Sequence, residues 1–317
     1  MKQYTSLYFV GAGGIGMSAL VRYFLAKGYK VAGYDRTQSP LTTELKTEGL
    51  EIVYEESVES IPDYCRNPET TLVVYTPAIP ASHAGLVYFR EHGFRVVKRA
   101  ELLGLITQSS KGLCFAGTHG KTTTSSMAAH IFHESPIGCN AFLGGILRNY
   151  NSNLILSEQS PFTVIEADEY DRSFHWLHPY MAVVTATDPD HLDIYGTEEA
   201  YLESFARFTS LIQPGGCLIM KKGIKLVPSV KENVKIYTYS ARDGGDFHAG
   251  NIRIGDGTIV FDFVMPEGSV ADIELGVPVE INIENAVAAM AIAWLNGVSG
   301  DDMRRAMASF KGAKRRF

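Results

Sequence analysis

The sequence has few cysteines and no long apolar run, and each of these absences excludes a class of protein. Its four cysteines show no C-x-x-C spacing, so neither a zinc site nor a disulfide framework is predicted. They are Cys65, Cys114, Cys139 and Cys217. No run of about 18 apolar residues occurs, and the N-terminus MKQYTSLYFV lacks the apolar core and cleavage site of a signal peptide. We therefore expect a cytoplasmic protein that does not insert into a membrane.

Basic residues are also not in excess. The formal net charge is −6, which argues against nucleic acid or an anionic membrane surface as the main partner. An anionic ligand must then be held by local basic groups and backbone amides. We expect a monomer or a weak homo-oligomer.

What the sequence does contain is enough apolar mass for two α/β domains. Its 317 residues are 45% hydrophobic and 20% charged, a globular composition too long for one ordinary domain. Short apolar runs such as SLYFV alternate with helical segments and tight glycine turns, which predicts a Rossmann-like parallel sheet over residues 1–108. A P-loop ATPase-type α/β domain is predicted over 109–317, with an antiparallel β extension at 234–281.

The stretch FAGTHGKTTT is typical of a phosphate-binding loop between a strand and a helix. Gly117 and Gly120 let a phosphate approach the backbone, Lys121 would contact the β- and γ-phosphates, and Thr122 is placed to bind Mg²⁺. Phe115 stands where the usual pattern has its first glycine, which indicates a shorter variant of the loop. The alternative is a purely structural turn, but a lysine in the first helical turn is unfavourable without an anion.

Two further segments follow predicted strands, where ligands bind in open α/β sheets. EADEYDRSF (166–174) places several carboxylates together, which a cation would compensate; the alternative is a solvated acidic loop. TATDPDHLDIYGT (185–197) contains His191, which is either a metal ligand or a surface histidine.

The N-terminal stretch FVGAGGIGMS carries a G-x-G-x-x-G pattern in Gly11, Gly13 and Gly16, with Asp35 at the end of the next predicted strand. This pattern first suggests NAD(P), and so an oxidoreductase. The same geometry holds any pyrophosphate at a helix N-terminus, so the motif alone does not choose the ligand.

Together these motifs resemble the Mur ligases, ATP-dependent amide-forming enzymes of peptidoglycan synthesis. The loop G-T-H-G-K-T-T, the E-A-D-E and H-x-D segments, INIENA (281–286) and KGAKRRF (311–317) occur in the family's order over essentially the whole chain. The resemblance assigns ATP to Gly117, Thr118, His119, Gly120, Lys121, Thr122, Thr123, Asn282, Asn285 and Arg316. It assigns Mg²⁺ to Thr122, Glu166 and His191, and catalysis to Lys121, Glu166 and His191.

The same resemblance makes UDP, and not NAD, the expected ligand of the N-terminal domain. It assigns the UDP-sugar to Gly11, Ala12, Gly13, Gly14, Ile15, Gly16, Asp35, Thr76, Ala78, Arg99, Asp168, Glu169 and Ser173. One departure is Ile281, where the family has a histidine before Asn282, and Asn282 could instead be a plain helix N-cap. No lysine lies between Arg172 and Lys221, which favours the alanine-adding branch over those that use a carbamylated lysine.

The implied reaction joins UDP-N-acetylmuramate to L-alanine through an acyl phosphate formed with ATP. The family's C-terminal domain has no counterpart in the sequence, so we expect nucleotide binding but poor ligation. The alternatives are a ligase that joins a whole peptide to the same sugar nucleotide, a non-catalytic nucleotide-binding module, and an NAD-dependent oxidoreductase.

Overall fold

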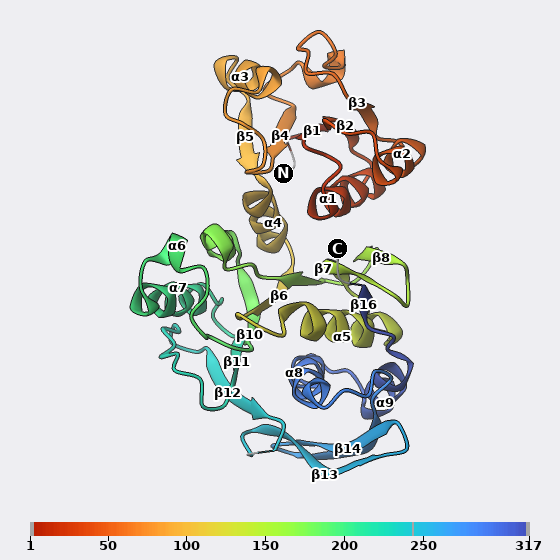
Figure 1. The fold of residues 1–317 in the computed structure, drawn as a ribbon, viewed down its shortest axis with the longest axis vertical. Coiled ribbons are helices and arrows are strands. Elements are labelled where there is room, and N and C mark those ends of the chain that lie inside the picture. The colour runs from red at the N-terminus through yellow and green to blue at the C-terminus, as the bar shows by residue number, and fades with distance from the viewer. Residues whose placement is uncertain (1–2, 243, 315–317) are drawn as a thin grey trace. The chain divides into compact units, whose positions relative to one another are not determined.

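The structure is a computed structural model that describes residues 3–242 and 244–314. The chain divides into two compact units, Met1–Ile106 and Thr107–Phe317 (Figure 1). Each unit is described by itself below. The assignment of a UDP-sugar to the predicted domain 1–108 and of ATP to the predicted domain 109–317 stays a prediction.

The first unit is built on a five-stranded parallel sheet in the order β3-β2-β1-β4-β5. Its strands are β1 (Ser6–Val10), β2 (Lys30–Tyr34), β3 (Glu51–Val53), β4 (Thr71–Tyr75) and β5 (Arg95–Lys98). The connecting elements are α1 (Ile15–Ala26), α2 (Pro40–Thr47), η1 (Asp63–Cys65), α3 (Ala84–Glu91) and α4 (Arg99–Gln108). Strand β1 is buried along its whole length, as expected of a central parallel strand covered on both faces. The predicted Rossmann-like sheet is confirmed.

The start of α2 shows how local sequence sets an element boundary in this unit. Ser39 accepts a hydrogen bond from the Thr42 N–H, and the Thr42 hydroxyl accepts one from the Ser39 N–H. Pro40 follows the cap at a position where its missing N–H costs no helical hydrogen bond.

The second unit contains an 11-stranded mixed sheet in the order β15-β14-β13-β12-β11-β10-β6-β9-β7-β16, with β8 paired to β7. The strands nearest the candidate site are β6 (Lys111–Ala116), β7 (Asn140–Leu147), β8 (Ser152–Ile155), β9 (Phe162–Glu166) and β10 (Pro179–Val184). The others are β11 (Cys217–Lys221), β12 (Lys235–Ser240), β13 (Phe247–Gly255), β14 (Thr258–Met265), β15 (Gly268–Glu274) and β16 (Ala313–Lys314). Strands β7, β9, β6, β10, β11 and β12 run parallel, so their carboxyl ends lie at one edge.

The antiparallel extension is confirmed in β13–β15, but it begins later than the sequence suggested. Strand β12 lies in the predicted antiparallel range, yet it pairs in parallel with both β11 and β13. The alternation of polar and apolar residues in this stretch carries no information on strand direction, and exposure in β12 instead decreases along the strand from Lys235 to Ser240.

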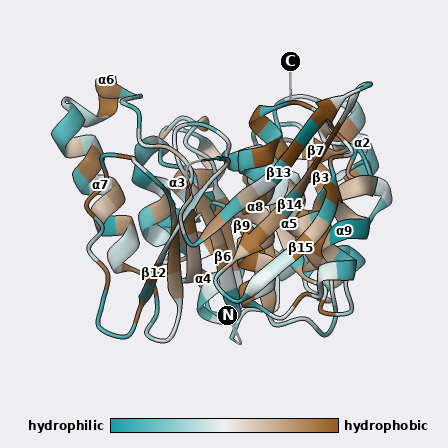
Figure 2. Ribbon diagram, turned by 90° about the horizontal axis from the view of Figure 1, so that it is seen from below, coloured by the Kyte–Doolittle hydropathy of each residue, from teal (hydrophilic) through white to brown (hydrophobic). Residues whose placement is uncertain are grey.

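Helices cover this sheet and form its core. They are η2 (Tyr170–Trp176), α5 (Lys121–Glu134), α6 (Leu192–Tyr195), α7 (Glu198–Ser210), α8 (Ile281–Leu295) and α9 (Gly300–Ser309). Helices α5 and α8 are almost wholly buried and pack together against the strands. Figure 2 shows the contrast between the apolar strands and the more hydrophilic α9. Among the described residues, no helix has the length and apolar character needed to cross a bilayer.

Candidate active site

The segment 117–120 forms a tight turn between the end of β6 and the start of α5. Gly117 and Gly120 have φ values of 139° and 84°, a region that favours glycine. The Thr185 hydroxyl lies under the turn, within hydrogen-bonding distance of the carbonyls of Ala116 and His119. Phe115 is fully buried inside β6, which explains the departure from the longer loop pattern, because the turn begins only at Gly117.

Lys121 is held by the loop and by a buried carboxylate. Its Nζ donates to the Gly117 carbonyl at 2.6 Å and lies 2.9 and 2.8 Å from the two oxygens of Glu169. The Glu169 side chain is only 2% exposed, so this ion pair is screened from water. The resemblance assigned Glu169 to the sugar substrate, and the structure gives it Lys121 as a direct partner.

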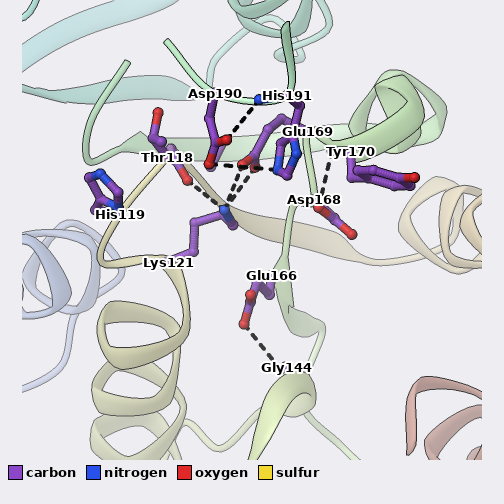
Figure 3. A network of polar contacts seen from close by, with 12 residues as sticks. Thr118, His119, Lys121, Gly144, Glu166, Asp168, Glu169, Tyr170, Asp190 and His191 are labelled. Atoms are coloured by element: carbon purple, nitrogen blue, oxygen red, sulfur yellow. Dashed lines mark hydrogen bonds and ion pairs between the residues drawn. The ribbon is translucent and has the colours of Figure 1, made fainter. Parts of the chain in front are cut away.

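Thr122 and Glu166 bring two oxygens together at the first turn of α5. Figure 3 shows the Glu166 carboxylate and its contact with Gly144. The Thr122 hydroxyl donates to Glu166 Oε1 at 3.0 Å, and the Gly144 N–H donates to Oε2 at 3.1 Å. A Cβ added at Gly144 would collide with this carboxylate, so a larger residue there would have to displace the Glu166 side chain. Burial raises the pKa of Glu166 above its ordinary value, and the hydrogen bond from Thr122 and the charge of Lys121 offset only part of that effect.

This donor set fits Mg²⁺, because that ion binds proteins through one or two carboxylate or hydroxyl oxygens and takes its other ligands from phosphates and water. Binding of a divalent cation would stabilise the charged form of this buried carboxylate, which burial disfavours. His191 lies on the other side of Lys121 from Glu166 in Figure 3. Over 3–242 and 244–314, no three His, Cys, Asp or Glu side chains group as a metal site. The role of His191 as a ligand stays a prediction.

His191 occupies an unusual backbone position before α6. Its φ is 51°, in the left-handed region, and its N–H donates to Asp190 Oδ1 at 2.7 Å. The Tyr170 ring meets the imidazole edge-on, with centroids 5.2 Å apart. This ring contact makes the acidic segment and the histidine segment neighbours. Within the acidic segment, Asp168 accepts a hydrogen bond from the Tyr170 N–H at 3.1 Å.

Asn282 and Asn285 lie within α8 and close to the phosphate loop. Thr124 Oγ1 donates to Asn285 Oδ1 at 3.2 Å, and Asn285 Nδ2 donates to Asn282 Oδ1 at 3.2 Å. The helix begins at Ile281 with Glu280 in the cap position, so the alternative reading of Asn282 as the N-cap is wrong. Ile281 is 61% exposed beside this pair. Arg316 lies outside the described residues.

In the first unit, the glycine loop is braced by its own acidic residue. The Gly13 N–H donates to Asp35 Oδ2 at 2.7 Å, and the Thr37 N–H donates to Asp35 Oδ1 at 3.0 Å. A Cβ at Gly16 would meet the Arg99 guanidinium, and one at Gly11 would meet Thr76. The structure therefore brings these predicted residues together, with Ala12 buried below them and Gly14 capping α1 from Ile15. Ala78 lies exposed in the turn after β4.

Comparison with known proteins agrees with this geometry. The Mur ligase middle domain matches residues 115–293, and the domain described as Mur ligase family, catalytic domain matches 6–111. The chain belongs to the Mur ligase family. It is 66% identical over all 317 residues to a UDP-N-acetylmuramate–L-alanine ligase of Parabacteroides distasonis, covering 69% of that protein. It is 55% identical over 312 residues to one from Porphyromonas gingivalis, covering 98% of this chain and 68% of that protein.

Solved structures of Mur ligases share the fold of this chain. The UDP-N-acetylmuramate–alanine ligase of Thermotoga maritima matches with a TM-score of 0.81 at 24% identity, over 98% of this chain and 70% of that one. A ligase from Neisseria meningitides that joins UDP-N-acetylmuramate to L-alanyl-γ-D-glutamyl-meso-diaminopimelate matches with a TM-score of 0.84 at 22% identity, over 98% of this chain and 100% of that one. The α/β fold class predicted from the sequence is confirmed.

Three residues of this Mur ligase site were missed by the sequence analysis. Gly144 and Thr185 support Glu166 and the phosphate loop, and Tyr201 lies within 3.0 Å of the Thr118 hydroxyl. A glycine inside a strand often marks a place where another group approaches closely, so Gly144 could have been recognised from the sequence. Thr185 and Tyr201 could not, because their contacts join segments far apart in the chain.

The first prediction concerns Gly144. In Gly144→Ala, the added methyl group must displace the Glu166 carboxylate, and we expect the affinity for Mg-nucleotide to fall about tenfold, as when a residue that orients a metal ligand is changed. Titration calorimetry with Mg-ADP measures this loss. Gly255→Ala is the matched control, because it also lies in a strand but its Cβ would meet nothing within 4 Å. Equal affinities for the two variants would contradict a role of Gly144 at this site.

The second prediction concerns the burial of Glu166. An unfolded glutamate loses its proton near pH 4.5, whereas the folded protein keeps this one protonated to a higher pH. Its ionisation therefore removes stability as pH rises from about 4.5 through the raised pKa. We expect Glu166→Gln to gain free energy of unfolding, relative to the unchanged protein, between pH 5 and pH 8 in EDTA.

Urea unfolding at both pH values measures that difference. Glu267→Gln, on the exposed turn before β15, is the control and should show no such gain. A gain that shrinks toward pH 8 would mean that hydrogen bonds to the carboxylate outweigh its burial.

Proposed function

We propose that this protein uses ATP to form an amide between the lactyl carboxylate of UDP-N-acetylmuramate and L-alanine. The observation that carries the proposal is the convergence of Lys121, Thr122 and Glu166 on one glycine turn at a helix N-terminus. Relatives that match the whole chain and are named UDP-N-acetylmuramate–L-alanine ligases support the choice of substrates. The implied ligands are ATP, Mg²⁺, UDP-N-acetylmuramate and L-alanine.

The first step is attack of the substrate carboxylate on the γ-phosphate, which yields an acyl phosphate and ADP. Two anions repel each other strongly, so rate enhancement must come from neutralising charge and aligning the oxygens. Lys121 supplies one positive charge on the loop, and the backbone N–H groups at the start of α5 supply partial charge. Thr122 and Glu166 would hold Mg²⁺, which contributes charge neutralisation and polarises the phosphoryl oxygens.

In the second step the amine of L-alanine attacks the acyl phosphate carbon. The tetrahedral intermediate collapses to the amide and inorganic phosphate. His191 is our candidate ligand for a second cation on the substrate side of Lys121, where it would stabilise the oxyanion of that intermediate. Asp168, Glu169 and Ser173 remain our candidates for the sugar-linked end of the substrate.

The first unit is the proposed UDP site. The turn at Gly11–Gly14 precedes α1, and Gly16 lies in its first turn, so the backbone here can receive a pyrophosphate at a helix N-terminus. Asp35 has both carboxylate oxygens engaged by Gly13 and Thr37, and each oxygen retains a free lone-pair direction for a ribose hydroxyl.

The third prediction tests the ligands directly. Calorimetric titration with UDP-N-acetylmuramate should show saturable binding, and titration with NADH should show none. NADH binding without UDP-sugar binding would contradict the proposal for the first unit. Competition between L-alanine and L-alanyl-γ-D-glutamyl-meso-diaminopimelate as the amine substrate then distinguishes the alanine-adding ligase from a peptide-joining one.

The fourth prediction concerns the Lys121–Glu169 pair. The β-phosphate of ATP or ADP would compete with Glu169 for Lys121, so the ion pair opposes nucleotide binding. Removing the negative charge in Glu169→Gln should tighten ADP binding about tenfold, or about 1.4 kcal/mol. Lys121→Ala should weaken nucleotide binding and slow ATP-dependent phosphate release by about 3 kcal/mol or more in the barrier.

Lys121→Ala also leaves a buried carboxylate unpaired, which costs about 3 to 5 kcal/mol of stability. The double variant Lys121→Ala/Glu169→Gln is the control, because it removes both charges. It should recover the stability but not the turnover. ATP-dependent phosphate release near the parent rate in Lys121→Ala would contradict the assignment of the turn at 117–120 as the ATP site.

A further inference from the structure

Tyr195 is a buried residue that contacts both the acidic segment and the histidine segment. It is 5% exposed, and its hydroxyl donates to the carbonyl oxygen of Glu169 at 2.5 Å. Its own backbone N–H donates to the His191 carbonyl at 3.1 Å. One residue therefore fixes the spacing between the two segments that supply Glu166 and His191.

The ring of Tyr195 is confined on several sides. The Arg172 guanidinium lies 4.8 Å from its centroid, and the Tyr201 ring meets it edge-on at 4.9 Å. The Ser204 hydroxyl lies 3.4 Å from the Tyr195 oxygen. These contacts hold the hydroxyl at the Glu169 carbonyl.

The backbone that Tyr195 holds is in an unfavourable conformation. Asp171 and Arg172 both have left-handed values, with φ of 51° and 54°, although neither is glycine. Such residues persist only where surrounding contacts hold them. The Glu169 carbonyl accepts from the Arg172 N–H at 3.0 Å as well as from Tyr195, so it is the point from which the turn is organised.

Tyr201 extends these contacts to the phosphate loop. It is fully buried, and its hydroxyl lies 3.0 Å from Thr118 Oγ1. The two tyrosine rings therefore connect the start of the loop to the backbone of Glu169. Figure 3 shows the contact of the Glu169 carboxylate with Lys121. These contacts run without a break from Thr118, at the start of the loop, to Lys121, at its end, beside the place proposed for the phosphates.

We propose that Tyr195 is a positioning residue for this nucleotide and metal site. Its hydroxyl holds the acidic segment at the distance from His191 and Lys121 that Mg-nucleotide requires. Packing alone would be satisfied by phenylalanine, so the hydroxyl is needed for the Glu169 carbonyl. The inference rests on the proposed function, because it assumes that nucleotide and Mg²⁺ bind there.

The fifth prediction compares Tyr195→Phe with Tyr150→Phe. Both lose a hydrogen-bonded phenol hydroxyl in the same unit, but Tyr150 contacts His130 and Glu134 toward the other end of α5. Calorimetry gives the ratio of ADP dissociation constants in EDTA and in Mg²⁺. Tyr195→Phe should lower this ratio about tenfold, as does the loss of other residues that hold a metal ligand in position. Tyr150→Phe should lower the melting temperature and leave the ratio unchanged.

An unchanged ratio in Tyr195→Phe, with a fall in melting temperature like that of Tyr150→Phe, would overturn the positioning role and leave the proposed function intact. Absence of Mg-dependent ADP binding by the unchanged protein would overturn both. If Tyr195→Phe does not fold, Arg172→Ala serves in its place, because Arg172 is exposed and its side chain covers the Tyr195 ring. It should lower the ratio in the same direction, and no change would overturn the proposal.

Discussion

The buried ion pair between Lys121 and Glu169 is the contact on which the rest of the site depends. A lysine in the first turn of α5 faces the positive end of the helix dipole, so it is unfavourable unless an anion lies close by. Glu169 supplies that anion at 2.8 Å, and its near-complete burial strengthens the attraction. In the proposed nucleotide site, a phosphate oxygen would compete with Glu169 for the Lys121 ammonium. The pair therefore holds Lys121 in place at the turn in the absence of a ligand.

Keeping Glu169 there requires contacts from distant segments. The carboxylate follows β9, whose end is placed by parallel pairing with β6, the strand that leads into the phosphate loop. Its backbone is held by Tyr195 from α6, while Thr185 after β10 supports the loop. Because parallel strands bring their carboxyl ends to one edge, three segments far apart in sequence meet at Lys121.

The sequence predicted the local geometry of this candidate site. The glycine turn at 117–120 could be found because Gly117 and Gly120 are needed for it, and the position of EADE because it directly follows a buried strand. The ligands assigned to both segments stay predictions. The sequence did not distinguish a carboxylate that faces a substrate from one that pairs with Lys121, since both have the same local pattern. Likewise, the direction of β12 depends on pairing with β11 and β13, which alternation within one strand does not encode.

The two units share one arrangement, a hydrogen bond from a glycine N–H to a carboxylate at a candidate ligand site. In each, a glycine N–H donates to a carboxylate at the end of a parallel strand: Gly13 to Asp35 in one unit and Gly144 to Glu166 in the other. In each, a Cβ on that glycine would collide with the acid. The N–H orients the carboxylate at short range but leaves lone pairs on both oxygens. A carboxylate held this way can therefore accept a hydroxyl donor or bind a cation while its hydrogen bond from the glycine N–H stays in place.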